Sequence, residues 1–103
     1  MADDVVSPYI YDGLTIKFSM RQLVYIFKQT YLSIQLEWAQ FSILDETLQK
    51  ADLERFAITT NINYSILTTI RDAIGDFQPV PDHITKEIAE LDEIILITKG
   101  YEQ

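Results

Sequence analysis

The residues best suited to chemistry lie in the last third of this 103-residue chain. His83 is the single histidine, and Glu87 follows it at the spacing that puts two side chains on one face of a helix. Together they offer two metal ligands. A usable site needs three or four, and the chain has no second histidine and no cysteine. The pattern therefore favours an exposed residue in the first turn of a helix over a metal ligand.

Three carboxylates, Glu87, Glu90 and Glu93, step by three along the same segment, with Asp92 beside them. In helical hydrolases that bind Mg²⁺, such acids come from at least two facing helices. The remaining predicted helices offer no matching pair, so a metal-dependent hydrolase is the least favoured reading. The pattern indicates a solvated acidic face or a surface that meets a basic partner.

Other catalytic patterns are missing from the sequence. It has no Gly-rich phosphate loop and no nucleophile elbow. The lack of cysteine excludes disulfides, thiolate metal sites and a cysteine nucleophile. We therefore expect no catalytic residue, no bound metal and no cofactor, and we predict that the protein is not an enzyme.

The net charge of −8 is distributed unevenly. Residues 72–103 hold eight acids against two lysines, whereas residues 13–36 hold three basic residues and no acid. Direct binding to nucleic acid or to anionic membranes is not expected, because both need clustered Lys and Arg. The most apolar stretch, 23–41, is interrupted by charged and amide side chains and falls short of the ~18 apolar residues that a membrane span needs.

The chain begins without the basic and apolar regions of a secretory signal. A cytoplasmic location is therefore expected, or the host cytoplasm or virion if the source is viral. Residues 1–8 are predicted to be a flexible leader. Residues 9–18 are predicted to form a hairpin or extended arm, because Asp12-Gly13 between aromatic and β-branched residues is a strong hairpin-turn signal.

A first helix is predicted over 19–44. Ser19 and Gln22 match the capping box, in which each side chain satisfies a backbone N–H of the first turn. Two apolar stripes run along the segment. The first stripe consists of Met20, Val24, Phe27, Tyr31, Ile34, Trp38 and Phe41. The second stripe consists of Tyr25, Leu32, Leu36, Ala39 and Ile43. A helix that is apolar on two faces is expected to lie centrally, with neighbours on more than one side.

A second helix is predicted over 46–75, with Asp45 as its cap and Gly75 as its end. Residues 59–63 are poor helix formers, so a break there is the alternative to a continuous helix. A last helix is predicted over 83–99, capped by Asp82 and closed by Gly100. The predicted fold is all-α: a small antiparallel bundle of three long helices, or four if the second breaks, in a single domain spanning 1–103.

Aromatic residues are the best candidates for a contact surface, because tyrosine combines a large rigid area with a polar tip. The interaction candidates are Tyr9, Tyr11, Tyr25, Tyr31, Trp38, Glu87, Glu90 and Glu93. The predicted function is a non-enzymatic protein–protein interaction module, a structural or adaptor component of a larger assembly such as a phage or virion. Its expected partners are proteins, with self-association included. The alternative is an acidic inhibitor that occupies the basic groove of a nucleic-acid enzyme.

Overall fold

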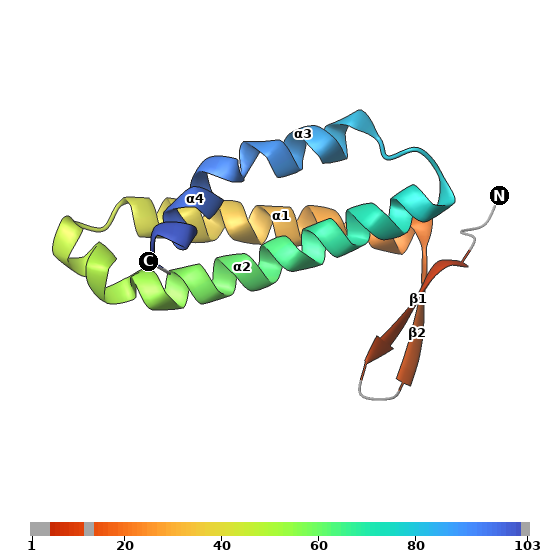
Figure 1. Ribbon diagram of the computed structural model, residues 1–103, viewed down its shortest axis with the longest axis horizontal. Coiled ribbons are helices and arrows are strands. Elements are labelled where there is room, and N and C mark those ends of the chain that lie inside the picture. Colours follow the sequence, from red (N-terminus) through yellow and green to blue (C-terminus); the bar gives the residue numbers. More distant parts are fainter. Residues whose placement is uncertain (1–4, 12–13, 102–103) are drawn as a thin grey trace.

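The computed structural model describes residues 5–11 and 14–101, and it describes side chains over 18–100. The elements in chain order are β1 (Val5–Tyr11), β2 (Leu14–Ser19), α1 (Met20–Ser42), α2 (Glu46–Phe77), α3 (Asp82–Glu90) and α4 (Asp92–Tyr101). Helices α1 and α2 lie side by side along an elongated body of 51 × 33 × 21 Å (Figure 1). The bent arm α3–α4 lies across one side of this pair. The predicted mostly helical bundle with an N-terminal hairpin is confirmed.

Strands β1 and β2 pair antiparallel, with Tyr11 opposite Leu14 and Pro8 opposite Lys17. Proline fits here because every strand of a two-stranded sheet is an edge strand. The strand begins at Val5, so residues 5–8 belong to β1 rather than to the predicted leader. Residues 1–4 and the predicted turn at 12–13 lie outside the described residues. The hairpin projects from the end of the bundle where α1 begins and α2 ends (Figure 1).

The predicted capping box opens α1. The Ser19 amide donates to Oε1 of Gln22 at 2.8 Å, and the Gln22 amide donates to Oγ of Ser19 at 3.2 Å. The face of α1 that packs against the core is the first stripe. Phe27, Tyr31 and Ile34 of the first stripe are buried, because this stripe faces both α2 and the α3–α4 arm.

Helix α2 is continuous through the stretch where a break was the alternative. Burial explains this, because Thr60 is fully buried and its place in the core favours the helix over a break. Asn61 keeps its amide occupied by donating to the Ala57 carbonyl at 2.8 Å. At the start of α2, Asp45 caps as predicted, accepting from the Leu48 amide at 2.9 Å.

Gly75 does not end α2, which continues to Phe77. The glycine serves a different purpose, because a Cβ at this position would lie 3.3 Å from Cγ2 of Val80. The absent side chain lets the returning 79–81 segment pass close to the helix. Gly100 likewise lies inside α4, which reaches Tyr101.

The predicted last helix, 83–99, is two helices joined by a bend at Leu91. The Leu91 amide donates to the Ile88 carbonyl at 3.0 Å, a tightened turn that interrupts the α-helical ladder. The bend keeps Leu91 buried while both flanking helices stay on the bundle. Asp82 is the first helical residue and not the cap, because Pro81 holds the N-cap position without a side-chain hydrogen bond.

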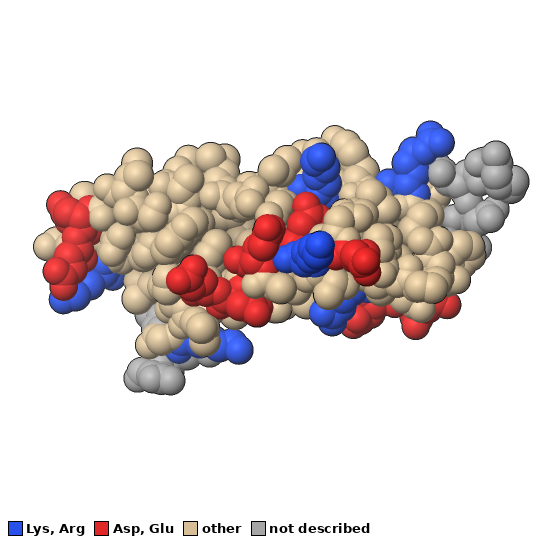
Figure 2. All heavy atoms as spheres, turned by 90° about the horizontal axis from the view of Figure 1, so that it is seen from above, with Lys and Arg blue, Asp and Glu red and all other residues tan. Residues whose placement is uncertain are grey.

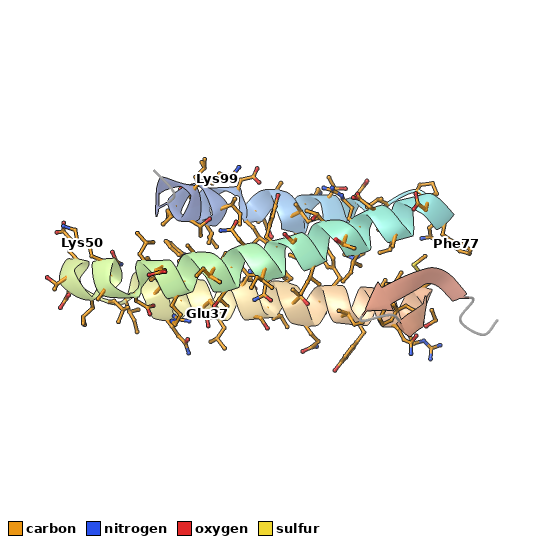
Figure 3. The ribbon with its side chains drawn as sticks, turned by 60° about the horizontal axis from the view of Figure 1, so that its bottom comes forward. Glu37, Lys50, Phe77 and Lys99 are labelled. Carbon is orange, nitrogen blue, oxygen red and sulfur yellow. The ribbon has the colours of Figure 1, made fainter. Side chains whose placement is uncertain are left out.

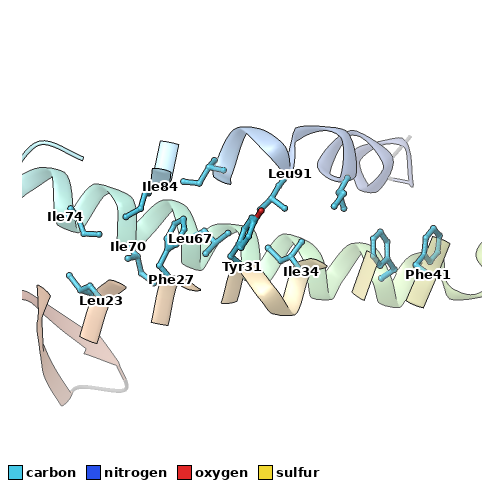
Figure 4. Close-up of a cluster of buried hydrophobic side chains, with 13 residues drawn as sticks. Leu23, Phe27, Tyr31, Ile34, Phe41, Leu67, Ile70, Ile74, Ile84 and Leu91 are labelled. Atoms are coloured by element: carbon cyan, nitrogen blue, oxygen red, sulfur yellow. The ribbon is translucent and has the colours of Figure 1, made fainter. Parts of the chain in front are cut away.

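One hydrophobic core joins all four helices (Figure 4). At the end near the α1–α2 turn, the rings of Phe41 and Phe56 stack with centroids 4.3 Å apart. Trp38 packs on both, with ring centroids 6.3 Å from Phe41 and 6.2 Å from Phe56. At the other end Ile74 and Ile84 are fully buried and join α2 to α3.

Candidate interaction surface

The second stripe of α1 lies on the surface. Tyr25 is 63% exposed, Leu36 is 60% exposed and Ile43 is 83% exposed. The expectation that neighbours would cover both apolar faces of α1 is wrong for this one. In the part of the chain that the structure describes, α2 packs along the first stripe, and the α3–α4 arm lies mainly against α2 and reaches the first stripe at Tyr31. The reason is geometric: helix α2 and the bent α3–α4 arm enclose only the inner side of α1.

Charged side chains are absent from the second stripe, although the protein carries a net charge of −8. The spacing of the stripe also includes position 29, where the residue is the uncharged Gln29 rather than an apolar one. Arg21 and Lys28 lie along the edge of the stripe. The face over α3 and α4 differs. Figure 2 looks down on α3 and α4 and shows acidic and basic side chains gathered over the middle of that face. The face over α3 and α4 thus carries charged side chains, whereas the second stripe carries none.

A second apolar feature lies between α1, α2 and the end of β2. It is a groove of about 460 Å³, lined by Phe18, Leu23, Ile26, Ile62, Ser65, Ile66, Thr69, Ile70 and Ala73. Its rim on α2 is exposed at Ile62 and Ile66. We call it the α1–α2 groove. It adds apolar surface at the hairpin end of the bundle.

A smaller hollow of about 390 Å³ opens at the first turns of α1, next to Tyr25. Its walls are Phe18, Arg21, Gln22, Tyr25 and Ile26. We call it the N-terminal hollow. It lies at one end of the second stripe, while Ile43 stands at the other end.

The five aromatic interaction candidates lie in different parts of the structure. Tyr9 and Tyr11 lie in β1, and their side chains are outside the described residues. Tyr25 is exposed on the second stripe. Tyr31 is buried, and Trp38 is half-buried against the Phe41–Phe56 stack. The structure therefore places one described aromatic candidate at the surface and two in the core.

Tyr31 has a structural task within the bundle. Its hydroxyl donates to Oε1 of Glu90 at 2.5 Å and accepts from Nε2 of Gln35 at 2.9 Å. The hydrogen bond to Glu90, followed by burial and by the charges of Glu90 and Glu87, raises the pKa of Tyr31 to about 12. The neutral phenol is therefore the form that the fold holds.

The bend at Leu91 divides the row of three carboxylates that the sequence suggested. Glu87 and Glu90 lie on α3 and Glu93 lies on α4, on either side of Leu91. Glu87 is half-buried, and Glu90 is engaged with Tyr31. The structure does not bring these three carboxylates into one straight row on a single helix.

Arg55 bridges the two long helices. It lies 3.0 Å from Oε1 of Glu37 on α1 and 2.7 Å from Oδ1 of Asp52 on α2. The hydrogen bond from Arg55 holds the pKa of Asp52 below its usual range. Figure 3 labels Glu37, which lies on α1 away from the α3–α4 arm. Arg55 thus forms ion pairs with one carboxylate from each of the two long helices.

Ile62 and Ile66 were not among the predicted site residues. Their signal was the four-residue spacing of Ile58, Ile62 and Ile66, which makes an exposed strip on α2. Within the described residues, no three His, Cys, Asp or Glu side chains are placed to hold a metal ion. In the same part of the chain, no helix is long and apolar enough to cross a bilayer.

No protein-family model, no curated protein and no solved structure matches this chain.

Proposed function

We propose that this protein is a non-enzymatic protein–protein interaction module, a structural or adaptor component of a larger assembly. The observation that carries the proposal is the second stripe: apolar residues over nearly three heptads, exposed and without charge, on the helix that anchors the core. Monomeric proteins rarely expose contiguous apolar surface of this kind, and such patches mark contact sites.

The distribution of charge supports the same function. Centres of protein interfaces are depleted of charged residues and enriched in aromatic and aliphatic ones. The second stripe has this composition in a protein where acids outnumber basic residues 16 to 8. An inhibitor of a nucleic-acid enzyme would instead present aligned carboxylates. The bend at Leu91 and the Tyr31–Glu90 hydrogen bond lessen the support for that alternative.

Affinity capture from an extract of the source cells, at low and at high salt, tests this function. Three baits are needed: the wild type, Leu36→Lys on the second stripe, and Leu96→Lys on α4 as the matched control. Leu36 is 60% exposed and Leu96 is 67% exposed, so both changes should leave the fold intact.

The proposal predicts protein partners that stay bound at high salt, because apolar contacts are not screened by ions. They should be retained by Leu96→Lys and lost by Leu36→Lys. Capture that disappears at high salt and is indifferent to Leu36→Lys would instead support the acidic inhibitor. Absence of both captured protein and self-association would contradict the proposed function.

A further inference from the structure

We infer that the second stripe pairs with the same stripe of a second copy, forming a two-fold symmetric antiparallel dimer centred on α1 near Ile34. The inference rests on the proposed function, since it names the chain itself as the occupant of that surface. It is carried by the spacing of the stripe, the N-terminal hollow, the charges along α1 and the place of the β-hairpin.

The spacing of the stripe is that of a coiled-coil seam. Including Gln29, the stripe positions are 25, 29, 32, 36, 39 and 43, which step alternately by four and three. This is the 3.5-residue repeat that lets two helices bury a shared seam. On α1 the repeat lies opposite the buried first stripe, so a second helix can reach it without disturbing the core.

An antiparallel alignment about Ile34 matches the seam to itself. Leu32 meets Leu36 of the second copy, and Tyr25 meets Ile43 of the second copy. The remaining pair places the long Gln29 beside the small Ala39. Each contact occurs twice, as a two-fold interface requires.

The N-terminal hollow fits this alignment. Ile43, 83% exposed, is the most exposed of the large apolar side chains in the described residues. The alignment places it against Tyr25 of the second copy, which lines the hollow of about 390 Å³ together with Gln22 and Ile26. A side chain entering a depression walled by residues of successive helical turns is the knob-into-hole contact of coiled coils.

Charge selects the antiparallel direction over the parallel one. Arg21 and Lys28 both lie in the first half of α1, so parallel helices would set like charges beside each other. Antiparallel helices instead bring Arg21 toward Asp45 and Glu46 at the start of the other copy's α2. Opposite charges at the rim of an interface favour the matching direction.

The β-hairpin favours the same direction. It projects from the end of the bundle where α1 begins (Figure 1). Parallel copies would bring both hairpins to one end, whereas antiparallel copies place one at each end. The antiparallel dimer therefore leaves the charged α3–α4 face of each copy open to further partners, as a component of a larger assembly requires.

Sedimentation of the purified full chain tests whether the dimer forms. The wild type should move from a 12.0 kDa monomer to twice that mass as concentration rises. Leu36→Lys should raise the dissociation constant at least about tenfold, because the substitution enters the interface twice. Leu96→Lys should leave it unchanged. A monomer at every concentration would overturn the dimer, and the capture experiment would still decide the proposed function.

Engineered cysteines test the direction, because the chain has no cysteine of its own. The variants Tyr25→Cys and Ile43→Cys, mixed in equal amounts and oxidised, should give a mixed disulfide between position 25 of one copy and position 43 of the other, identified by intact mass. In the antiparallel dimer two copies of position 25 lie about 27 Å apart along the axis, too far for a disulfide. Products joined only 25 to 25 and 43 to 43 would show a parallel dimer and overturn the inference. Leu96→Cys is the control for random collision.

Discussion

The hydroxyl of Tyr31 on α1 donates a hydrogen bond to Glu90 in the last turn of α3, 59 residues later in the chain. This contact ties the long helical pair to the bent arm directly before the bend at Leu91. Figure 4 shows the Tyr31 side chain reaching toward Leu91. It also removes one carboxylate from the acidic surface that the sequence suggested for a basic partner. Glu90, a candidate for contact with a partner, is thus hydrogen-bonded within the fold.

The Tyr31–Glu90 contact should make stability depend on alkaline pH. The folded state holds the pKa of Tyr31 at about 12, above its value of 10.0 in the unfolded chain. A raised pKa means that the folded state keeps its proton longer, so stability is full below pH 10 and is lost as the pH rises toward about 12. Urea unfolding at pH 8, 10 and 11 should show this decline.

Tyr31→Phe is the control for that titration. It removes the phenol, so it should reduce stability at neutral pH by about 1 kcal/mol and flatten its decline above pH 10. A decline of the same size in Tyr31→Phe would assign the effect to other groups and contradict this reading of the contact.

Leu67 and Leu36 should respond very differently to the same change. Leu67 is fully buried in the core, whereas Leu36 lies on the second stripe. Leu67→Ala should cost about 2–5 kcal/mol because it leaves a cavity, while Leu36→Ala should stay within about 0.5 kcal/mol under monomeric conditions. Chemical denaturation at low protein concentration measures both. Equal costs would mean that the stripe is packed in the isolated chain.

Gly75 and Val80 should be coupled. A Cβ at position 75 gains helix propensity of up to about 1 kcal/mol but meets Cγ2 of Val80 at 3.3 Å. Gly75→Ala alone should therefore be near neutral. Val80→Ala removes the obstructing methyl groups, so Gly75→Ala should be stabilising in that background. A double-mutant cycle by thermal unfolding measures the coupling, and strictly additive effects would rule out the contact.

Asp45 should contribute to stability as the N-cap of α2. Its carboxylate accepts from the Leu48 amide at 2.9 Å. Asp45→Ala leaves that amide without its side-chain partner and should cost about 1 kcal/mol, whereas Asp45→Ser should retain most of the stability. Denaturation midpoints at neutral pH compare the two variants. A serine variant as weak as the alanine variant would show that charge, rather than capping, makes the contribution.

Local chemistry determined much of the fold. The Ser19–Gln22 capping box, the Asp45 cap and the hairpin flanking Asp12-Gly13 follow from short-range spacing, and each has a partner within three residues or across one turn. The two stripes of α1 also follow from spacing alone, because helical periodicity assigns a residue to a face. The sequence therefore sufficed for the existence of these elements and for the composition of both faces.

Long-range packing decided the rest. The residue types around Gly75 and Leu91 do not show that the chain turns back to place Val80 beside Gly75, or that Leu91 is buried in the core shared by all four helices. The sequence showed that α1 has two apolar faces, and only the tertiary structure decided that one is enclosed and the other exposed. The physical reason is that periodicity specifies which side chains share a face. Whether that face is buried depends on how many other elements the chain can bring against it.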